Sequence, residues 1–112
     1  MAADLRAHVS ALLDHNLDAG RQDATALLTD AGDQVTFAQV HAMACRVGRR
    51  LRDDLGVRRE ERVLLVLDDT PAFHAAFLGA IRIGAVPVPV NILARSADYA
   101  YFLDDSYARV AV

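Results

Sequence analysis

The apolar positions of the first third of the chain follow two different periods. Leucine and valine recur at helical spacing near the N-terminus, and this stripe consists of Leu5, Val9, Leu12, Leu13 and Leu17. The sequence Asp18-Ala19-Gly20 is typical of the end of such a helix. Residues 24–29 and 34–36 are short extended runs on either side of Asp30-Ala31-Gly32-Asp33, so we expect a β-hairpin with a tight turn.

A second helix is predicted to begin directly after this hairpin. Thr36 and Gln39 have the spacing of a capping box, in which each side chain accepts a hydrogen bond from the backbone of the other residue. Gly56 is suited to end the helix in the left-handed conformation. The apolar positions between these signals predict one buried stripe: Phe37, Val40, Met43, Ala44, Val47, Leu51 and Leu55.

The middle of the chain gives the clearest pattern. Residues 63–67 are apolar at every position, which is typical of a strand covered on both faces in a parallel sheet. Thr70 and Pro71 suit the N-cap and the first position of a helix that ends before Gly84 and is buried through Phe73, Phe77, Ala80 and Ile81. Residues 86–90 form the next strand, which completes a predicted βαβ unit.

Two prolines in that second strand predict which of its edges is paired. Pro87 and Pro89 lack backbone N–H groups, and residues two apart direct these groups to the same edge. A full ladder is possible only through the valines at positions 86, 88 and 90. We therefore expect the other edge to be free, poorly paired or covered by something other than a regular strand.

The remaining pattern repeats the alternation of helix and strand. Ser96 is predicted to cap a short helix that carries Tyr99, Phe102 and Leu103, and residues 109–112 open a new strand. The predicted fold class is α/β: the start of a doubly wound, mostly parallel sheet with covering helices, preceded by an N-terminal helix and a β-hairpin. We expect an incomplete domain.

Composition narrows the possible chemistry. The 112 residues are 54% hydrophobic and carry a net charge of -3, and all twelve basic residues are arginine. The absence of lysine excludes a Schiff base or a phosphate-loop lysine from this chain, and the charge argues against a nucleic-acid partner. Arginines and carboxylates alternate over residues 46–62, which predicts a solvated face of mixed charge. We expect a cytoplasmic protein without a membrane span, in which the single Cys45 is a buried thiol.

Few residues suggest a catalytic site. Asp68 and Asp69 follow the first buried strand, where open α/β sheets bind ligands, and could hold Mg²⁺ as in a response-regulator receiver. That comparison fails because the next strand ends in Asn91 instead of a phosphate-accepting aspartate. We expect the two carboxylates to favour the positive end of the following helix, with His74 exposed or capping. His41 is predicted to be a lone, partly packed histidine.

Several segments in order carry a resemblance to a known family: Val35-Thr36-Phe37-Ala38-Gln39-Val40, Leu55-Gly56-Val57, Glu61-Arg62-Val63-Leu64-Leu65, Ala76-Phe77-Leu78-Gly79-Ala80 and Gly84-Ala85-Val86-Pro87-Val88-Pro89-Val90-Asn91. Together they resemble the N-terminal region of the acyl-adenylate-forming (AMP-binding) superfamily. Asn91-Ile92-Leu93 and Asp98-Tyr99-Ala100-Tyr101-Phe102-Leu103 look most like the benzoate-CoA ligase branch.

This resemblance implies a parent enzyme that activates an aryl, benzoate-like carboxylic acid with ATP and Mg²⁺ and then forms a thioester with coenzyme A. Residues 1–112 would be the truncated N-terminal part of its AMP-binding domain, with the rest of the chain as their partner. The phosphate loop, the ribose-binding acid, the acid pocket and the mobile lysine of the family would lie beyond Val112. No catalytic, cofactor-binding or metal-binding residue is therefore expected here, and the positions that match the family's scaffold are Gly84, Pro87, Pro89 and Asn91.

Two other functions fit the same residues. One is part of an adenylation domain that loads a carrier protein, which would differ only in the polypeptide beyond Val112. The other is a self-standing α/β interaction module, whose free sheet edges and apolar helix faces would be closed by dimerisation or by a partner. The sequence leaves open the acid, the acceptor and the oligomeric state.

Overall fold

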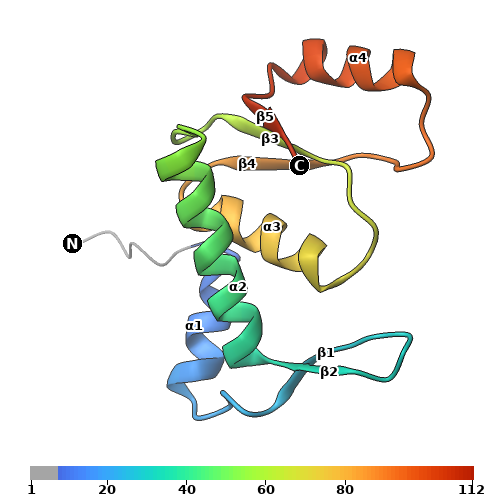
Figure 1. Cartoon of the computed structure of the whole chain (residues 1–112). Coiled ribbons are helices and arrows are strands. Elements are labelled where there is room, and N and C mark those ends of the chain that lie inside the picture. The colour runs from blue at the N-terminus through green and yellow to red at the C-terminus, as the bar shows by residue number, and fades with distance from the viewer. Residues whose placement is uncertain (1–7) are drawn as a thin grey trace.

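A computed structural model describes residues 8–112, in which a helix and a hairpin lead into a small parallel sheet (Figure 1). The prediction for Leu5 lies outside the described residues. No helix among the described residues is long and apolar enough to cross a bilayer. The elements are α1 (Ala11–Asp18), β1 (Thr25–Leu28), β2 (Gln34–Thr36), α2 (Phe37–Arg49), the π-helical turn η1 (Arg50–Asp54), β3 (Arg62–Leu65), α3 (Pro71–Arg82), β4 (Val86–Pro89), α4 (Ser96–Ser106) and β5 (Val110–Ala111).

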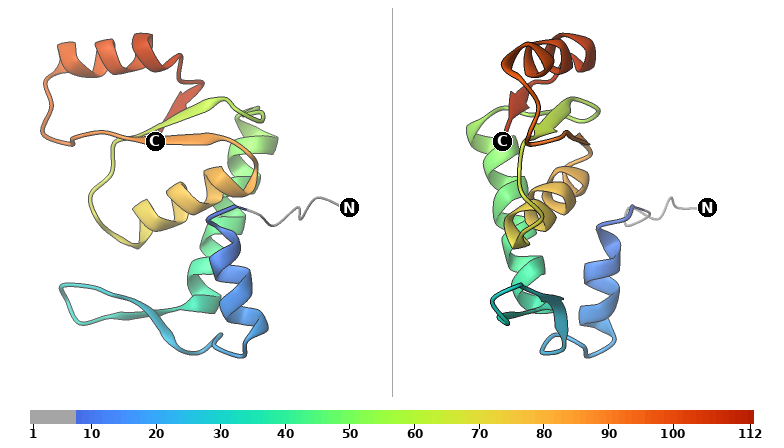
Figure 2. Two further views of the ribbon diagram at one scale, coloured as in Figure 1. Left: turned by 180° about the vertical axis from the view of Figure 1, so that it is seen from behind. Right: turned by 90° about the vertical axis from the view of Figure 1, so that its right-hand side faces the viewer.

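The parallel sheet has the order β4-β3-β5, and helices lie on both of its sides. Figures 1 and 2 show α3 on one side of the sheet and α4 on the other. Val63, Leu64 and Leu65 of β3 are all buried, which confirms a strand covered on both faces. The βαβ unit β3-α3-β4 and the α/β fold class are therefore confirmed, although β3, β4 and β5 are each shorter than the predicted strands.

The prolines of β4 direct its pairing as predicted. The backbone N–H of Val86 donates to the carbonyl of Glu61, just before β3, at 2.9 Å, and that of Val90 donates to the carbonyl of Leu65, the last residue of β3, at 3.1 Å. Among the described residues β4 is an edge strand, and β3 is its only strand neighbour. The edge that lacks the two proline donors is the unpaired one, so the ladder loses no hydrogen bond.

The hairpin and the start of α2 also form as predicted. Strands β1 and β2 pair antiparallel, and this second sheet is separate from the parallel one. The Thr36 hydroxyl accepts from the Gln39 N–H at 3.2 Å, while the side-chain Oε1 atom of Gln39 accepts from the Thr36 N–H at 2.8 Å. This capping box satisfies two donors that a helix start otherwise leaves unpaired.

The end of α2 departs from the predicted stripe. Leu51 is buried, but Leu55 is 48% exposed. The cause is η1, where the Leu55 N–H donates to the Arg50 carbonyl five residues back and the wider turn rotates Leu55 away from the core. Gly56 follows with a φ of +67°, so its role as the left-handed residue after the helix is confirmed.

The buried face of α3 is made of small residues, and of its predicted positions only Ala80 is fully buried. The fully buried positions of α3 are Ala75, Ala76, Gly79 and Ala80, whereas the predicted Phe73, Phe77 and Ile81 are half-buried. A side chain added at Gly79 would lie 2.6 Å from the Ala44 carbonyl oxygen. The two helix backbones thus approach too closely for large residues, which pack around the crossing instead.

Two further predictions need correction. In α1 only Leu13 is buried, while Val9 and Leu12 are 58% and 63% exposed, because α1 packs mainly against one neighbour, α2 (Figure 2). At α4 the N-cap is Arg95, not Ser96. The Arg95 N–H donates to the Asp98 carboxylate at 3.0 Å, so the acceptor comes from the first turn of the helix and the hydroxyl is not needed.

Candidate functional site

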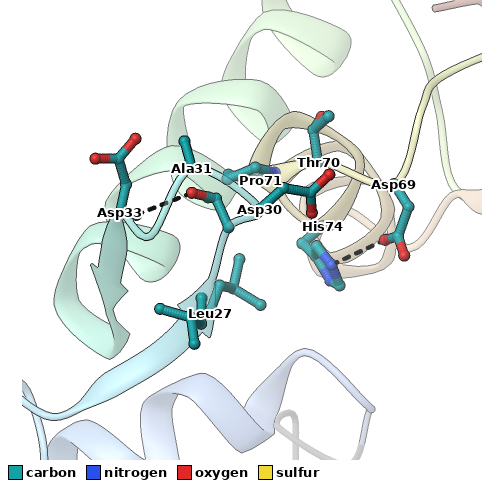
Figure 3. Close-up of a pocket in the computed structure, with 10 residues that line it drawn as sticks. Leu27, Asp30, Ala31, Asp33, Asp69, Thr70, Pro71 and His74 are labelled. Atoms are coloured by element: carbon teal, nitrogen blue, oxygen red, sulfur yellow. Dashed lines mark hydrogen bonds and ion pairs between the residues drawn. The ribbon is translucent and has the colours of Figure 1, made fainter.

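The carboxyl end of β3 leads into a pocket between the hairpin and the start of α3 (Figure 3). Its volume is about 430 Å³. The hairpin supplies one wall with Leu27 of β1 and Asp30 of the turn, and the first turn of α3 supplies the other with Pro71 and His74. The full lining is Leu27, Leu28, Thr29, Asp30, Ala31, Asp33, Asp69, Thr70, Pro71 and His74.

Charge in this pocket comes mainly from carboxylates. Asp69 lies 3.4 Å from the Nε2 atom of His74, which is the nearest approach of opposite charge in the pocket when the imidazole is protonated. The Asp69 side chain is 92% exposed, so water screens this pair. Figure 3 shows both side chains at the rim of the pocket. The hollow can therefore receive a polar group, but the exposed pair of Asp69 and His74 holds the imidazole only weakly.

The structure places the acidic pair apart from further metal ligands. Asp68 and Asp69 precede α3, and the Thr70 N–H donates to the Asp68 carbonyl at 2.8 Å. Within residues 8–112 no group of three or more histidine, cysteine, aspartate or glutamate side chains is arranged to hold a metal ion. Thr70 occupies the predicted N-cap position, yet its side chain makes no capping hydrogen bond. Pro71 is at the start of α3 as predicted.

His41 is not a lone histidine, as the sequence suggested, because it belongs to a cluster that joins three helices. Its Nε2 atom lies 3.0 Å from Asp14 of α1. Arg82 of α3 donates to the same carboxylate through both terminal nitrogens, at 2.7 and 3.1 Å, and to the buried hydroxyl of Ser10 at 3.4 Å. Cys45 is half-buried beside the histidine, with its Sγ atom 3.8 Å from Nε2.

This cluster changes the acidity of its carboxylate. The hydrogen bonds from Arg82 lower the pKa of Asp14 below its ordinary value of 3.8, and the contact with His41 lowers it further, while partial burial opposes both effects. Asp14 in turn raises the pKa of Arg82. Sequence reasoning missed the cluster because its members lie far apart along the chain, and only the packing of α1 on α2 and α3 brings them together.

Asn91 shapes the loop that leaves β4. Its side-chain oxygen accepts from the Leu93 N–H at 2.9 Å, and its carbonyl accepts from the Tyr99 hydroxyl at 2.8 Å. These bonds tie the loop to α4 and leave the Leu93 side chain 85% exposed. Gly84, with a φ of +82°, makes the turn before the strand, as its position in the sequence predicts.

The comparison with protein families gives one match over most of the chain. The family described as AMP-binding enzyme matches residues 13–112. The chain is also 43% identical over 101 residues to a benzoate-CoA ligase of Thauera aromatica, a match that covers 90% of this chain and 19% of that protein.

Comparison with solved structures also finds CoA ligases. The chain superposes on a benzoate CoA ligase from Burkholderia xenovorans LB400 with a TM-score of 0.84 and 42% identity, covering 93% of this chain and 21% of that one. An anthranilate CoA ligase in complex with anthranoyl-AMP gives a TM-score of 0.85 and 36% identity, with coverage of 93% and 20%. The chain thus spans about a fifth of the length of these relatives.

Proposed function

Because the chain belongs to the AMP-binding enzyme family, we propose that it is the N-terminal part of an acid-CoA ligase. The enzyme activates a benzoate-like aromatic carboxylic acid with ATP, through an acyl-adenylate, and passes the acyl group to coenzyme A. The proposal includes Mg²⁺ as the companion of ATP and the cytoplasm as the location. The partner of this segment is the rest of its own polypeptide.

One observation carries the choice of substrate class. The chain is 43% identical to a benzoate-CoA ligase and 42% identical to a 3-hydroxybenzoate-CoA ligase, whereas identity to a long-chain-fatty-acid-CoA ligase is 33%. The likeness also extends to the two structures with aromatic acids in their names. These features favour an aromatic acid over an aliphatic one.

The role of these residues in such an enzyme is to build a scaffold. The 112 residues include no lysine, so a lysine that steers the acyl-adenylate would come from another part of the enzyme. What they supply is the buried centre of a parallel sheet, with β3 held between β4 and β5. In α/β enzymes such a sheet positions ligands at the carboxyl ends of its strands.

The proposal is tested on the product of the complete open reading frame that contains this sequence. Purified protein is assayed for pyrophosphate release with benzoate, 3-hydroxybenzoate, anthranilate and a long-chain fatty acid, each with and without coenzyme A. We expect activity that depends on an aromatic acid, and formation of its CoA thioester. The 112-residue chain, as a matched control, should release no pyrophosphate.

Three results would change the conclusion. Pyrophosphate release without a CoA thioester, together with acyl transfer to a carrier protein, would indicate the carrier-loading reaction. A preference for the fatty acid would overturn the substrate class. Absence of any acid-dependent pyrophosphate release from a folded protein would overturn the ligase proposal itself.

A further inference from the structure

Two neighbouring hollows form an arginine-lined groove beside the C-terminal end of α2. Figure 1 shows that this end of the helix lies near the parallel sheet. The hollows have volumes of about 200 and 270 Å³, and they share Arg52 and Ile83. We call this surface the arginine groove. Its lining residues are Cys45, Gly48, Arg49, Arg52, Gly56, Val57, Arg58, Arg59, Arg82 and Ile83.

The charged residues of the groove are all cations. Five arginines line it and no carboxylate does. Arg82 is neutralised by Asp14, and Arg52 pairs with Asp53 at 2.8 Å. No ion pair within residues 8–112 involves the other three, which are Arg49, Arg58 and Arg59. The groove therefore has an excess of positive charge. The sequence does not indicate this excess, because acids and arginines are interleaved along it.

Local contacts fix the segment that carries Arg58 and Arg59. The Arg58 N–H donates to the Glu61 carboxylate at 2.8 Å, which fixes the turn before β3. The aliphatic part of Arg59 packs on the turn after α3, because a side chain built at Gly84 would lie 3.1 Å from its Cγ atom. The guanidinium of Arg109, from the C-terminal segment, lies close to Gly56 of the groove. A Cβ atom added at Gly56 would be 3.7 Å from its Nη2 atom.

The dipole of α2 explains the position of only one of the three arginines that form no ion pair. Arg49 is in the last turn of α2, where a cation is favourable. Arg58 and Arg59, however, lie beyond the helix, at the amino ends of β3 and β4. Ligands of open α/β sheets bind at the opposite, carboxyl ends. The groove is thus separate from the edge where the ligase reaction is proposed, and binding in the groove does not depend on that reaction.

We propose that the arginine groove binds a small, multiply charged phosphate anion. Guanidinium groups bind phosphate oxygens through paired hydrogen bonds. Arg49, Arg58 and Arg59 line the two hollows and form no ion pair among the described residues, although Asp53 attracts Arg49 at longer range. Because the two hollows share Arg52 and Ile83, we expect a condensed phosphate to reach from Arg49 in the first hollow to Arg58 in the second. A single phosphate reaches only one hollow, so inorganic pyrophosphate binds more tightly than inorganic phosphate.

The test is calorimetric titration with pyrophosphate, and separately with phosphate, at constant ionic strength. The sample is the 112-residue chain if it unfolds cooperatively in urea, and otherwise the product of the complete open reading frame. We expect saturable binding of pyrophosphate with a Kd below about 1 mM. Arg49→Gln and Arg58→Gln should each weaken binding roughly tenfold, the effect of one lost charge-assisted hydrogen bond. Arg46→Gln is the matched control, because Arg46 is exposed on the same helix but lies outside the groove.

Amide NMR shifts locate the bound anion in the same samples. Binding in the groove shifts the resonances of residues 56–59 and leaves those of α4 unchanged. The inference is overturned if pyrophosphate gives no saturable heat up to about 10 mM. It is also overturned if all three variants weaken binding equally, or if the shifted amides lie elsewhere. Circular dichroism of each variant confirms that the fold is retained, which is expected because the three side chains are exposed.

Discussion

Replacement of Gly79 by alanine tests the close crossing of α2 and α3. A Cβ atom at this position would lie 2.6 Å from the Ala44 carbonyl oxygen and 3.1 Å from the Gly48 nitrogen. Both of these atoms belong to the backbone, so no side-chain rotation relieves the clash. The two helices have to separate, and the buried alanines beside Gly79 lose part of their contact.

Two opposing effects determine how much Gly79→Ala changes the free energy of unfolding. Overpacking of a well-packed interior costs about 1–3 kcal/mol. Alanine in place of glycine inside a helix is favourable by about 0.5–1 kcal/mol. The clash exceeds the gain in helix propensity, so we expect Gly79→Ala to lower the free energy of unfolding by about 1–2 kcal/mol. For a chain of this size each kcal/mol lowers Tm by roughly 4–8 °C.

Urea unfolding followed by circular dichroism measures the effect. Ala42→Gly is the matched reference, because Ala42 is exposed in the interior of α2 and the reverse substitution there reports helix propensity alone. It should cost about 0.5–1 kcal/mol. If Gly79→Ala is as stable as the parent chain while Ala42→Gly shows the expected loss of stability, the inferred close contact between α2 and α3 is refuted.

Three further perturbations test other parts of the fold by the same measurement. Asp14→Asn should cost about 1–2 kcal/mol at pH 7, because Arg82 loses its anionic partner. Because folding lowers the pKa of Asp14, the stability difference between the parent chain and the Asp14→Asn variant should be complete at pH values above 3.8, the ordinary pKa. It should vanish as the pH falls through the pKa of the folded protein, and a difference independent of pH would refute the role of this carboxylate. Thr36→Ala should cost about 1 kcal/mol by removing the cap, whereas no loss would contradict the capping role. Val88→Pro should cost about 3 kcal/mol or more, while Pro87→Val should be nearly neutral; equal effects would contradict the assigned edge.

Local signals in the sequence were sufficient to predict the scaffold. The capping box at Thr36 and the left-handed turn at Gly56 each depend on residues a few positions apart, and both form. The prolines of β4 predicted its free edge because backbone geometry alone decides where their missing donors point. These features need no knowledge of the rest of the fold.

Features that depend on distant packing could not be predicted in the same way. Leu55 has the spacing of a buried residue, but the π-helical turn before it rotates it outward. Gly79 gave no sign in the sequence that α2 would approach so closely. The cluster of Asp14, His41 and Arg82 joins three helices, and no periodicity links its members. Each of these outcomes is decided by how elements meet, not by how each one forms.

The two ends of the parallel sheet present different chemistry, which keeps the two proposals independent. Beyond the carboxyl end of β4 lie Ile92 and Leu93, which are 41% and 85% exposed, and apolar groups of this kind favour cover by further polypeptide. The amino ends carry the arginine groove, whose unpaired charges are stable in water and need no such cover. A ligase that covers the first end can leave the second open to an anion. Loss of anion binding would therefore not weaken the case for the ligase, and failure of the ligase assay would not remove the groove.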